Sequence, residues 1–301
     1  MSDETEDKPD SPTVRLATTT AMGRTANSSG KDRYPHHRDA TDKGELLAPA
    51  LLVSFFYLNL FQDNRHQFHF RDWVLDSGAF SAHNSGVEIN LDDYIRKCQE
   101  LQDTDPALTE IFSLDVIGDW QASVKNCEKM WAAGVEAIPT YHYGEPVDVL
   151  LGLAKDYPKI ALGGAVGLKG NTKVKFAEQC FARVWPKKIH GFGYGSEKAL
   201  MAVPFHSVDA TNWEMGPCAF GRWRSFGGKL SVRGSSQNLR SEVEWYLRLE
   251  QRARARWRKE MAILDDQPAP TVRLAEANAA RIGRRLQALA KPETSQTNEG
   301  D

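Results

Sequence analysis

Short apolar runs of strand-like composition alternate along this chain with amphipathic stretches of helical spacing. The runs that predict strands are Leu51–Leu58, Trp73–Phe80, Ile111–Ile117, Glu136–Tyr143, Lys159–Val166, Lys188–Tyr194 and Ser207–Thr211. The stretches that predict helices are Asp92–Gln102, Gln121–Ala133, Val147–Tyr157, Thr172–Trp185 and Glu197–Val203. Strands alternating with helices of this kind predict a parallel sheet. Seven strands in this order favour a closed (β/α)8 TIM barrel over an open sheet, with Leu230–Arg233 as the candidate eighth strand.

The two ends of the chain differ from this middle part. Residues 1–45 are rich in Ser, Thr, Asp, Lys and Gly without periodicity, which predicts a disordered N-terminal arm. Residues 46–265 form the predicted α/β barrel domain, which ends in a long basic helix over Ser241–Met261. Residues 266–301 predict a mostly disordered tail, with a short helical stretch near Ala275–Leu289. The barrel is therefore a short one for its class.

Charge distribution says more than net charge. The 301 residues carry a net charge of only -2, which does not indicate any class of binding partner. Between Arg222 and Lys259, however, eleven Lys and Arg stand against three Glu, which suggests a polyanionic partner. The alternative is an amphipathic surface helix whose charges are solvated.

Cysteine usage and hydropathy bear on the compartment. The four cysteines (Cys98, Cys127, Cys180 and Cys218) are scattered without zinc-like pairs. We interpret them as reduced thiols, mostly buried in helices, of a cytoplasmic protein. No apolar run is long enough to cross a membrane, so no membrane partner is expected.

Polar residues follow the predicted strands at their C-terminal ends, where a barrel of this class builds its active site. The residues concerned are Asp76, Ser77 and Gly78 after one strand, Asp115 after the next, then Tyr141 and His142, the pair Gly163 and Gly164, and finally Asp209. Asp119 is the expected N-cap of the following helix, which leaves Asp115 free for a site. Consecutive glycines such as Gly163 and Gly164 would let a ligand contact the backbone.

Carboxylates at these positions suit chemistry at a sugar carbon. Asp209 could attack an anomeric carbon and form a covalent intermediate, while Asp76 acts as the general acid/base. Aromatic residues such as Tyr141 could stack on a planar base. Each residue also has a simpler interpretation: Asp76 as an Asx-turn, Asp209 as a loop-bonding carboxylate, and one aromatic ring packed between strand and helix. No Cys or His partner gives His142 metal-ligand spacing, so no metal site and no cofactor is predicted.

These motifs resemble the tRNA-guanine transglycosylase superfamily over about residues 50–225. Asp76-Ser77-Gly78-Ala79-Phe80 is similar to that family's DSGGFQ motif, and Ala161-Leu162-Gly163-Gly164-Ala165-Val166-Gly167 to its ALGGLAVG motif. The strand ending at Asp209 is similar in position to its nucleophile strand, and Ser113-Leu114-Asp115 to its base-recognising aspartate.

The resemblance implies a TIM barrel that exchanges guanine for a 7-deazaguanine in nucleic acid. It implies that Asp209 attacks C1′, Asp76 takes a proton from the incoming base, and Asp115 reads the base edge beside Ser77, Gly78, Tyr141, His142, Gly163 and Gly164. Arg222, Arg224, Lys229 and Arg233 would contact the nucleic-acid backbone. A homodimer is left open.

Two departures from the family favour DNA as the substrate. After Asp209 only Cys218 is present, so the zinc-binding insertion of the tRNA enzymes is absent. The family's Gln-Gly-Gly strand end is replaced by Tyr141-His142-Tyr143-Gly144. A short, zinc-free member is most similar to the phage and bacterial enzymes that place 7-deazaguanines such as 7-cyano-7-deazaguanine in DNA. The alternatives are exchange in tRNA, a non-catalytic nucleic-acid binding barrel, and a barrel enzyme for a small phosphorylated substrate.

Overall fold

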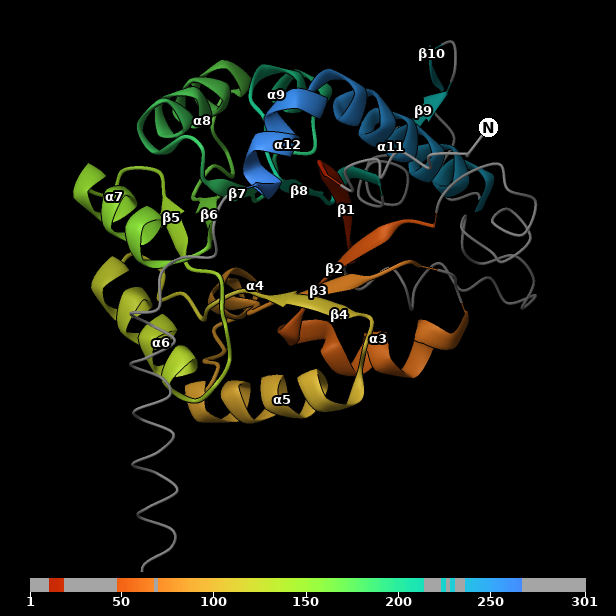
Figure 1. The fold of residues 1–301 in the computed structure, drawn as a ribbon. Coiled ribbons are helices and arrows are strands. Elements are labelled where there is room, and N and C mark those ends of the chain that lie inside the picture. The colour runs from red at the N-terminus through yellow and green to blue at the C-terminus, as the bar shows by residue number, and fades with distance from the viewer. Residues whose placement is uncertain are drawn as a thin grey trace, which may run out of the picture.

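The computed structural model describes residues 11–18, 48–67, 70–213, 223–225, 228–230 and 236–266, with the backbone alone at 223–225, 228–230 and 236–241. A ring of parallel strands is surrounded by helices (Figure 1). The strands are β1 (Thr13–Thr18), β2 (Ala50–Ser54), β3 (Trp73–Asp76), β4 (Leu108–Ile111), β5 (Thr140–His142), β6 (Lys159–Gly163), β7 (Lys188–Gly191) and β8 (Ser207–Ala210). The helices between them are α3 (Leu58–Asn64), α4 (Ala79–Asn84), α5 (Leu91–Thr104), α6 (Trp120–Ala132), α7 (Val147–Asp156), α8 (Gly170–Val184) and α9 (Glu197–Ala202).

The sheet closes on itself. Its strand order is β4-β3-β2-β1-β8-β7-β6-β5, and each pair is parallel. The two remaining edges meet at a parallel bridge between Phe112 and Ile138, supported by the bond from Ile138 N to Ile111 O (2.8 Å). Eight parallel strands with alternating helices confirm the predicted (β/α)8 barrel.

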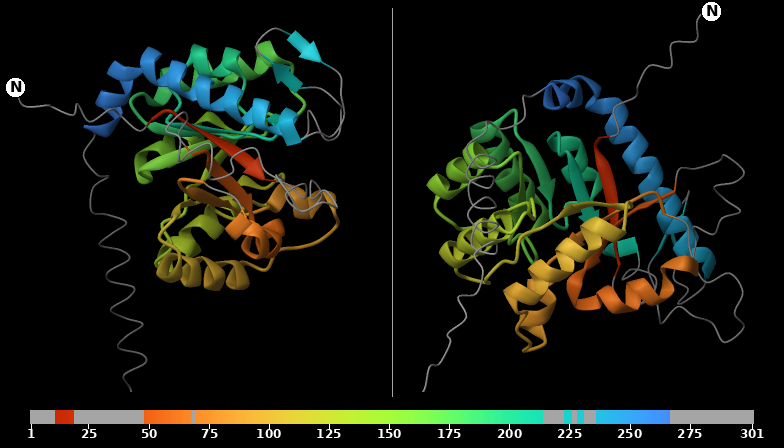
Figure 2. Two further views of the ribbon diagram at one scale, coloured as in Figure 1. Left: turned by 90° about the vertical axis from the view of Figure 1, so that its right-hand side faces the viewer. Right: turned by 60° about the horizontal axis from the view of Figure 1, so that its bottom comes forward.

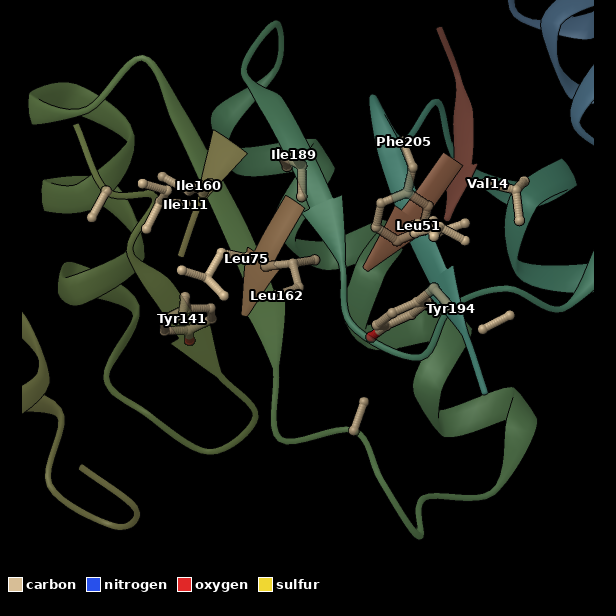
Figure 3. Packing of buried hydrophobic residues seen from close by; sticks show 14 of the residues in the cluster. Val14, Leu51, Leu75, Ile111, Tyr141, Ile160, Leu162, Ile189, Tyr194 and Phe205 are labelled. Atoms are coloured by element: carbon tan, nitrogen blue, oxygen red, sulfur yellow. The ribbon is translucent and has the colours of Figure 1, made fainter. Parts of the chain in front are cut away.

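The strand period of two separates an outer from an inner layer of side chains. Outward-facing residues such as Leu51, Leu75 and Leu162 pack toward the helices in the larger core cluster (Figure 3). Inward-facing residues form a smaller cluster that fills the barrel: Ala17, Leu52, Val74, Phe112, Ile138 and Ala161. Cys98, Cys127 and Cys180 are buried in α5, α6 and α8, as predicted, and Cys218 lies outside the described residues.

The N-terminal segment corrects two expectations. Residues 13–18 lie in the segment expected to be disordered, yet they form β1, the strand between β2 and β8 (Figure 2). The expected eighth strand at Leu230–Arg233 is wrong, because β10 (Gly228–Leu230) pairs antiparallel with β9 (Trp223–Ser225) in a separate sheet. The alternation in Thr13–Thr18 is short, and its inward side carries Arg15 where an apolar residue would be expected, so its strand signal is weak. The tail beyond Asp266, with the stretch Ala275–Leu289, lies outside the described residues.

Several elements differ from the sequence prediction in their extent. The strand predicted over Leu51–Leu58, for example, ends at Ser54, and the one predicted over Ile111–Ile117 is β4 at Leu108–Ile111. The strand predicted over Trp73–Phe80 ends at Asp76, because Gly78 adopts φ 76° and α4 begins at Ala79. The long helix predicted over Ser241–Met261 is divided at Trp257 into α11 (Ser236–Arg256) and α12 (Arg258–Asp265).

A buried carboxylate attaches α11 to the barrel. Glu250 is 2% exposed, and its Oε2 accepts a hydrogen bond from the Val14 backbone N (2.7 Å). The Arg71 guanidinium donates to both of its oxygens (2.7 and 2.9 Å), and Arg254 lies 3.0 Å from Oε1. Glu250 therefore ties α11, β1 and the segment before β3 together at the N-terminal end of the barrel.

Burial makes this carboxylate a sensitive test of the fold. We expect Glu250→Gln to lower the free energy of unfolding by about 3 kcal/mol, because it leaves the partly buried Arg71 guanidinium without its charged partner. Glu197→Gln is the matched control, since the Arg252–Glu197 pair (2.7 Å) also links α11 to the barrel but is half-exposed. Urea denaturation followed by circular dichroism measures the free energy of unfolding of both variants. Equal losses in the two variants would contradict the role of Glu250 in attaching α11 to the barrel.

Candidate functional site at the C-terminal end of the barrel

Asp76 ends β3 and lies among negative charges. Its Oδ2 accepts a hydrogen bond from Gly78 N (3.1 Å), so the Asx-turn foreseen as an alternative is present. The pKa of Asp76 is raised to about 7, chiefly by burial and also by the charges of Asp115 and Asp209, which together outweigh the lowering effect of the Gly78 and Ser77 backbone N–H groups. The structure thus brings together three of the predicted carboxylates, and one of them exchanges protons near neutral pH.

Gly78 is required by the packing at this strand end. A Cβ at this position would lie 2.6 Å from Ser54 Oγ and 2.9 Å from Phe56 N, and its φ of 76° is left-handed. Ser77 beside it is buried. This part of the motif therefore has a structural reason, independent of any ligand.

Asp115 is held by an ion triad. Its Oδ2 lies 3.4 Å from His142 Nε2, and His142 Nδ1 lies 3.0 Å from Glu145 Oε1. Burial alone would lower the pKa of His142, but the contacts with Asp115 and Glu145 outweigh it and raise that pKa to about 10. His142 is therefore an imidazolium at neutral pH and compensates part of the negative charge of the site.

One oxygen of this triad remains available. Asp115 Oδ1 is buried and has no hydrogen-bond partner among the described residues. Buried polar atoms normally have a partner, so an unused acceptor at the end of a barrel strand is a place where a ligand N–H group could bind.

Gly163 and Gly164 make room for the His142 strand end. A Cβ at Gly163 would lie 2.8 Å from His142 Cδ2, and one at Gly164 would lie 2.9 Å from Tyr143 N. The Gly163 carbonyl accepts a hydrogen bond from Tyr143 N (3.1 Å). Their backbone role toward a ligand, expected from the sequence, stays a prediction, while their packing role is now explained.

Asp209 lies inside the barrel near the end of β8, where the β7–α9 loop holds it. Its Oδ1 accepts a hydrogen bond from Gly193 N (2.6 Å), and its backbone O accepts one from Gly195 N (3.0 Å). A Cβ at Gly195 would lie 2.4 Å from the Ala210 Cβ, so only glycine fits where this loop crosses the end of β8. Lys173 of α8 donates to the Gly193 carbonyl (2.5 Å), so the loop is fixed on both sides.

Tyr141 is placed apart from the carboxylates. It faces outward, is buried, and packs against Phe176 of α8 at 5.8 Å between ring centroids (Figure 3). Its hydroxyl donates to the Glu145 backbone O (2.9 Å). The packing between strand and helix that the sequence left open therefore applies to Tyr141, and the structure does not bring this side chain to the site.

Of the predicted nucleic-acid contacts, Arg222 and Arg233 lie outside the described residues. Arg224 and Lys229 are cross-strand partners in the β9–β10 hairpin, beside α11 (Figure 1). In the C-terminal part of α11, Arg254 and Arg256 donate to the backbone O atoms of Pro12 and Met201. Part of the basic segment thus anchors the helix to the barrel, as the surface-helix alternative supposed.

The functional candidates that the sequence reasoning missed include Glu145, Lys173 and His190. Glu145 is three residues after His142, a spacing that could have suggested the pair. His190 lies 3.5 Å from Asp209 Oδ1 through Nε2, and its place in a short apolar strand gave no sign of a site. Lys173 lies on a helix whose pattern indicates only an exposed charge.

The described residues contain neither a metal-site cluster nor a membrane-spanning helix. In the ranges given above, no group of three or more His, Cys, Asp or Glu has the arrangement of a metal site. Within the same ranges, no helix combines the length and the apolar character needed to span a membrane.

Comparisons with known proteins leave the family open. No protein-family model matches the chain, and no curated protein matches it. Two solved structures of the carboxyl transferase domain of Rhizobium etli pyruvate carboxylase are similar to the chain. The structure without pyruvate has a TM-score of 0.40 and 14% identity, and the structure with pyruvate has a TM-score of 0.39 and 12% identity. They align with 94% and 92% of this chain, which spans about half (54%) of their length.

The raised pKa of Asp76 makes stability depend on pH. Its folded-state pKa of about 7 lies above the unfolded value of 3.8, so ionisation costs the folded state more as pH rises from about 4 to 7. The full shift corresponds to about 4 kcal/mol, and partial solvation reduces it to about 2 kcal/mol. We therefore expect Asp76→Asn to be about 2 kcal/mol more stable than the wild type at pH 8, with a gap that shrinks toward pH 5.

Urea denaturation at both pH values measures that gap. Asp119→Asn is the control, because Asp119 is an exposed N-cap whose side chain accepts from Ala122 N (3.0 Å). A gap for Asp76→Asn that is the same at pH 5 and pH 8 would mean that Asp76 is ionised in both conditions.

Proposed function

We propose that this protein is an enzyme, a base-exchange transglycosylase that replaces guanine in DNA by a 7-deazaguanine such as 7-cyano-7-deazaguanine. The observation that carries the proposal is the convergence of Asp76, Asp115 and Asp209 at the C-terminal end of the barrel, with the pKa of Asp76 at about 7. These are the carboxylates on which the family resemblance rests.

Asp209 serves as the nucleophile. A carboxylate oxygen forms a bond to the nucleotide C1′ while the C1′–N9 bond breaks, and the electron pair of that bond leaves with the guanine. The developing charge on the guanine is neutralised by a proton from Asp76. The product of this half-reaction is an aspartyl ester that holds the DNA covalently, as in retaining sugar transfer.

Asp76 then works in the opposite direction. As a carboxylate it removes the N9 proton of the incoming deazaguanine, whose N9 attacks C1′, and the ester bond to Asp209 breaks. A group that both donates and accepts a proton works best when its pKa is near the operating pH, which the environment of Asp76 provides.

Asp115 and its neighbours suit base recognition. The unpartnered Asp115 Oδ1 is an acceptor for N–H groups on a purine edge, and the imidazolium of His142 fixes the other oxygen. Phe80, Tyr143 and Val166 are exposed and follow β3, β5 and β6 at the same end of the barrel. Such side chains can contact the faces of a flipped base.

DNA is preferred over tRNA because the chain lacks the zinc-site cysteines of the tRNA enzymes after Asp209, and because Arg224 and Lys229 offer positive charge after the nucleophile strand. Cationic side chains would add sequence-independent, salt-sensitive affinity for the phosphate backbone.

The proposal is tested by base exchange in vitro. Purified protein is mixed with DNA or tRNA containing labelled guanine and with 7-cyano-7-deazaguanine, and the release of label is followed. We expect release from DNA, a loss of about 1,000-fold or more in Asp209→Ala, and a covalent protein–DNA species on denaturing gels with the wild type only.

Asp119→Asn is the matched control, because it removes an exposed carboxylate at the same end of the barrel and should exchange at the wild-type rate. The wild-type rate should also change with pH near 7, a dependence that Asp76→Asn removes. Release of label only from tRNA would support the base-exchange reaction and overturn the choice of DNA as the substrate. No release from either substrate by a folded protein would overturn the proposal in favour of a binding role.

A further inference from the structure

A chain of buried polar contacts runs along the barrel interior to Asp209. Lys159 Nζ donates to Ser207 Oγ (3.0 Å), and Ser207 Oγ lies 2.8 Å from His190 Nδ1. His190 Nε2 in turn lies 3.5 Å from Asp209 Oδ1. All four side chains are buried, and His190 is fully inaccessible between the rings of Phe112 and Phe192.

The direction of the first contact is fixed by chemistry. Lys159 also donates to both oxygens of Glu110 (2.6 and 2.8 Å), and the charges of Lys159 and Arg15 hold the pKa of that carboxyl low although burial acts to raise it. Burial lowers the pKa of Lys159 itself, but the charge of Glu110 opposes that effect, and the three contacts of Nζ (two to Glu110 and one to Ser207) are those of an ammonium group, which can only donate. Ser207 Oγ therefore accepts a hydrogen bond from Lys159, and the Ser207 hydroxyl can donate its own hydrogen to a second partner.

The hydrogen of Ser207 determines the tautomer of His190. In the described residues the other contact of Ser207 Oγ is His190 Nδ1, so the hydroxyl donates there and Nδ1 acts as an acceptor. Burial lowers the pKa of His190, which keeps the imidazole neutral with a single proton. That proton then lies on Nε2, which faces Asp209 Oδ1. The opposite tautomer would place a lone pair of Nε2 against a carboxylate oxygen.

The two oxygens of Asp209 are consequently different. Oδ1 accepts from Gly193 N (2.6 Å) and faces His190 Nε2. Among the described residues no donor contacts Oδ2. The hydrogen bond from Gly193 N holds Oδ1, and His190 Nε2 faces the same oxygen at a distance slightly longer than a hydrogen bond, so Oδ2 is left to react.

We propose that His190 is a positioning residue for Asp209: the Lys159–Ser207 pair orients its Nε2–H toward Oδ1, and Oδ2 is the oxygen that reacts. The inference rests on the proposed function for the identity of the reaction. In it, Oδ2 forms the bond to C1′, the C1′–N9 bond breaks with its electron pair leaving on the base, and Oδ1 becomes the ester carbonyl that still faces the Nε2–H and Gly193 N–H groups.

The hydrogen-bond direction is tested without any substrate. Protein labelled with ¹⁵N-histidine is studied by two-bond ¹H–¹⁵N correlation spectra, and the His190 signals are assigned by their loss in His190→Phe. We expect the Nε2–H tautomer in the wild type and a change in the tautomer populations in Ser207→Ala. Ser113→Ala is the control, because Ser113 is equally buried but its Oγ has no hydrogen-bond partner in the part of the chain that the structure describes, and it should leave the His190 signals unchanged.

The same variants test the effect on the reaction. We expect His190→Phe, which keeps a flat ring but lacks the N–H group, to lower kcat for exchange about 10-fold or more with KM for DNA unchanged. His190→Gln restores an N–H donor and should recover most of that loss. Thermal unfolding of each variant shows that the protein is folded.

The outcomes separate the two proposals. An Nδ1–H tautomer in the wild type, or signals that are insensitive to Ser207→Ala, would overturn the positioning role of His190. Equal rates for the Phe and Gln variants would overturn it as well. The Nε2–H tautomer in a wild-type protein that releases no guanine would support the positioning of Asp209 and overturn only the proposed reaction.

Discussion

The closure of the barrel depends on the hydrogen bonds and ion pairs of the buried Glu250 carboxylate. It accepts from the Val14 backbone, binds the Arg71 guanidinium through both oxygens and pairs with Arg254, so a helix near residue 250 holds a strand near residue 14. Other attachments of β1 include its backbone pairing to β2 and β8, the Arg15–Asp72 ion pair and the hydrogen bond from Trp213 to Ala17 O. Removing a buried carboxylate that is surrounded by donors lowers the stability of the fold strongly, because the donors are left without a partner.

The closure of the barrel also determines the relative positions of the residues in the candidate site. Asp209 lies on β8, directly beside β1, and Asp76 lies on β3, two strands away on the other side. The register of β1 with its two neighbours therefore sets how far the two carboxylates are from each other. Ion pairs at the N-terminal end of the barrel and carboxylates at the C-terminal end are connected through the same strands.

The fold was largely predictable, because the alternation of apolar strands and amphipathic helices is strong between residues 50 and 210. The strand Thr13–Thr18 was not, since Arg15 is an inward-facing charge whose partner Asp72 (2.5 Å) is far away in the sequence. Asp76, Asp115 and Asp209 were predictable as strand-end carboxylates. His190, Ser207 and Lys159 were not, because their importance comes from contacts between three different strands that no local pattern contains.

The position of β1 has a consequence for how this protein can be shortened or permuted. A chain beginning at residue 46 would retain most of the apolar core and every residue proposed to react, yet it would lack the strand between β2 and β8. Two sheet edges with unpaired backbone groups would then face solvent, and such edges pair readily with those of other molecules. The strand Thr13–Thr18 thus protects the barrel from self-association, although it contributes no proposed catalytic group.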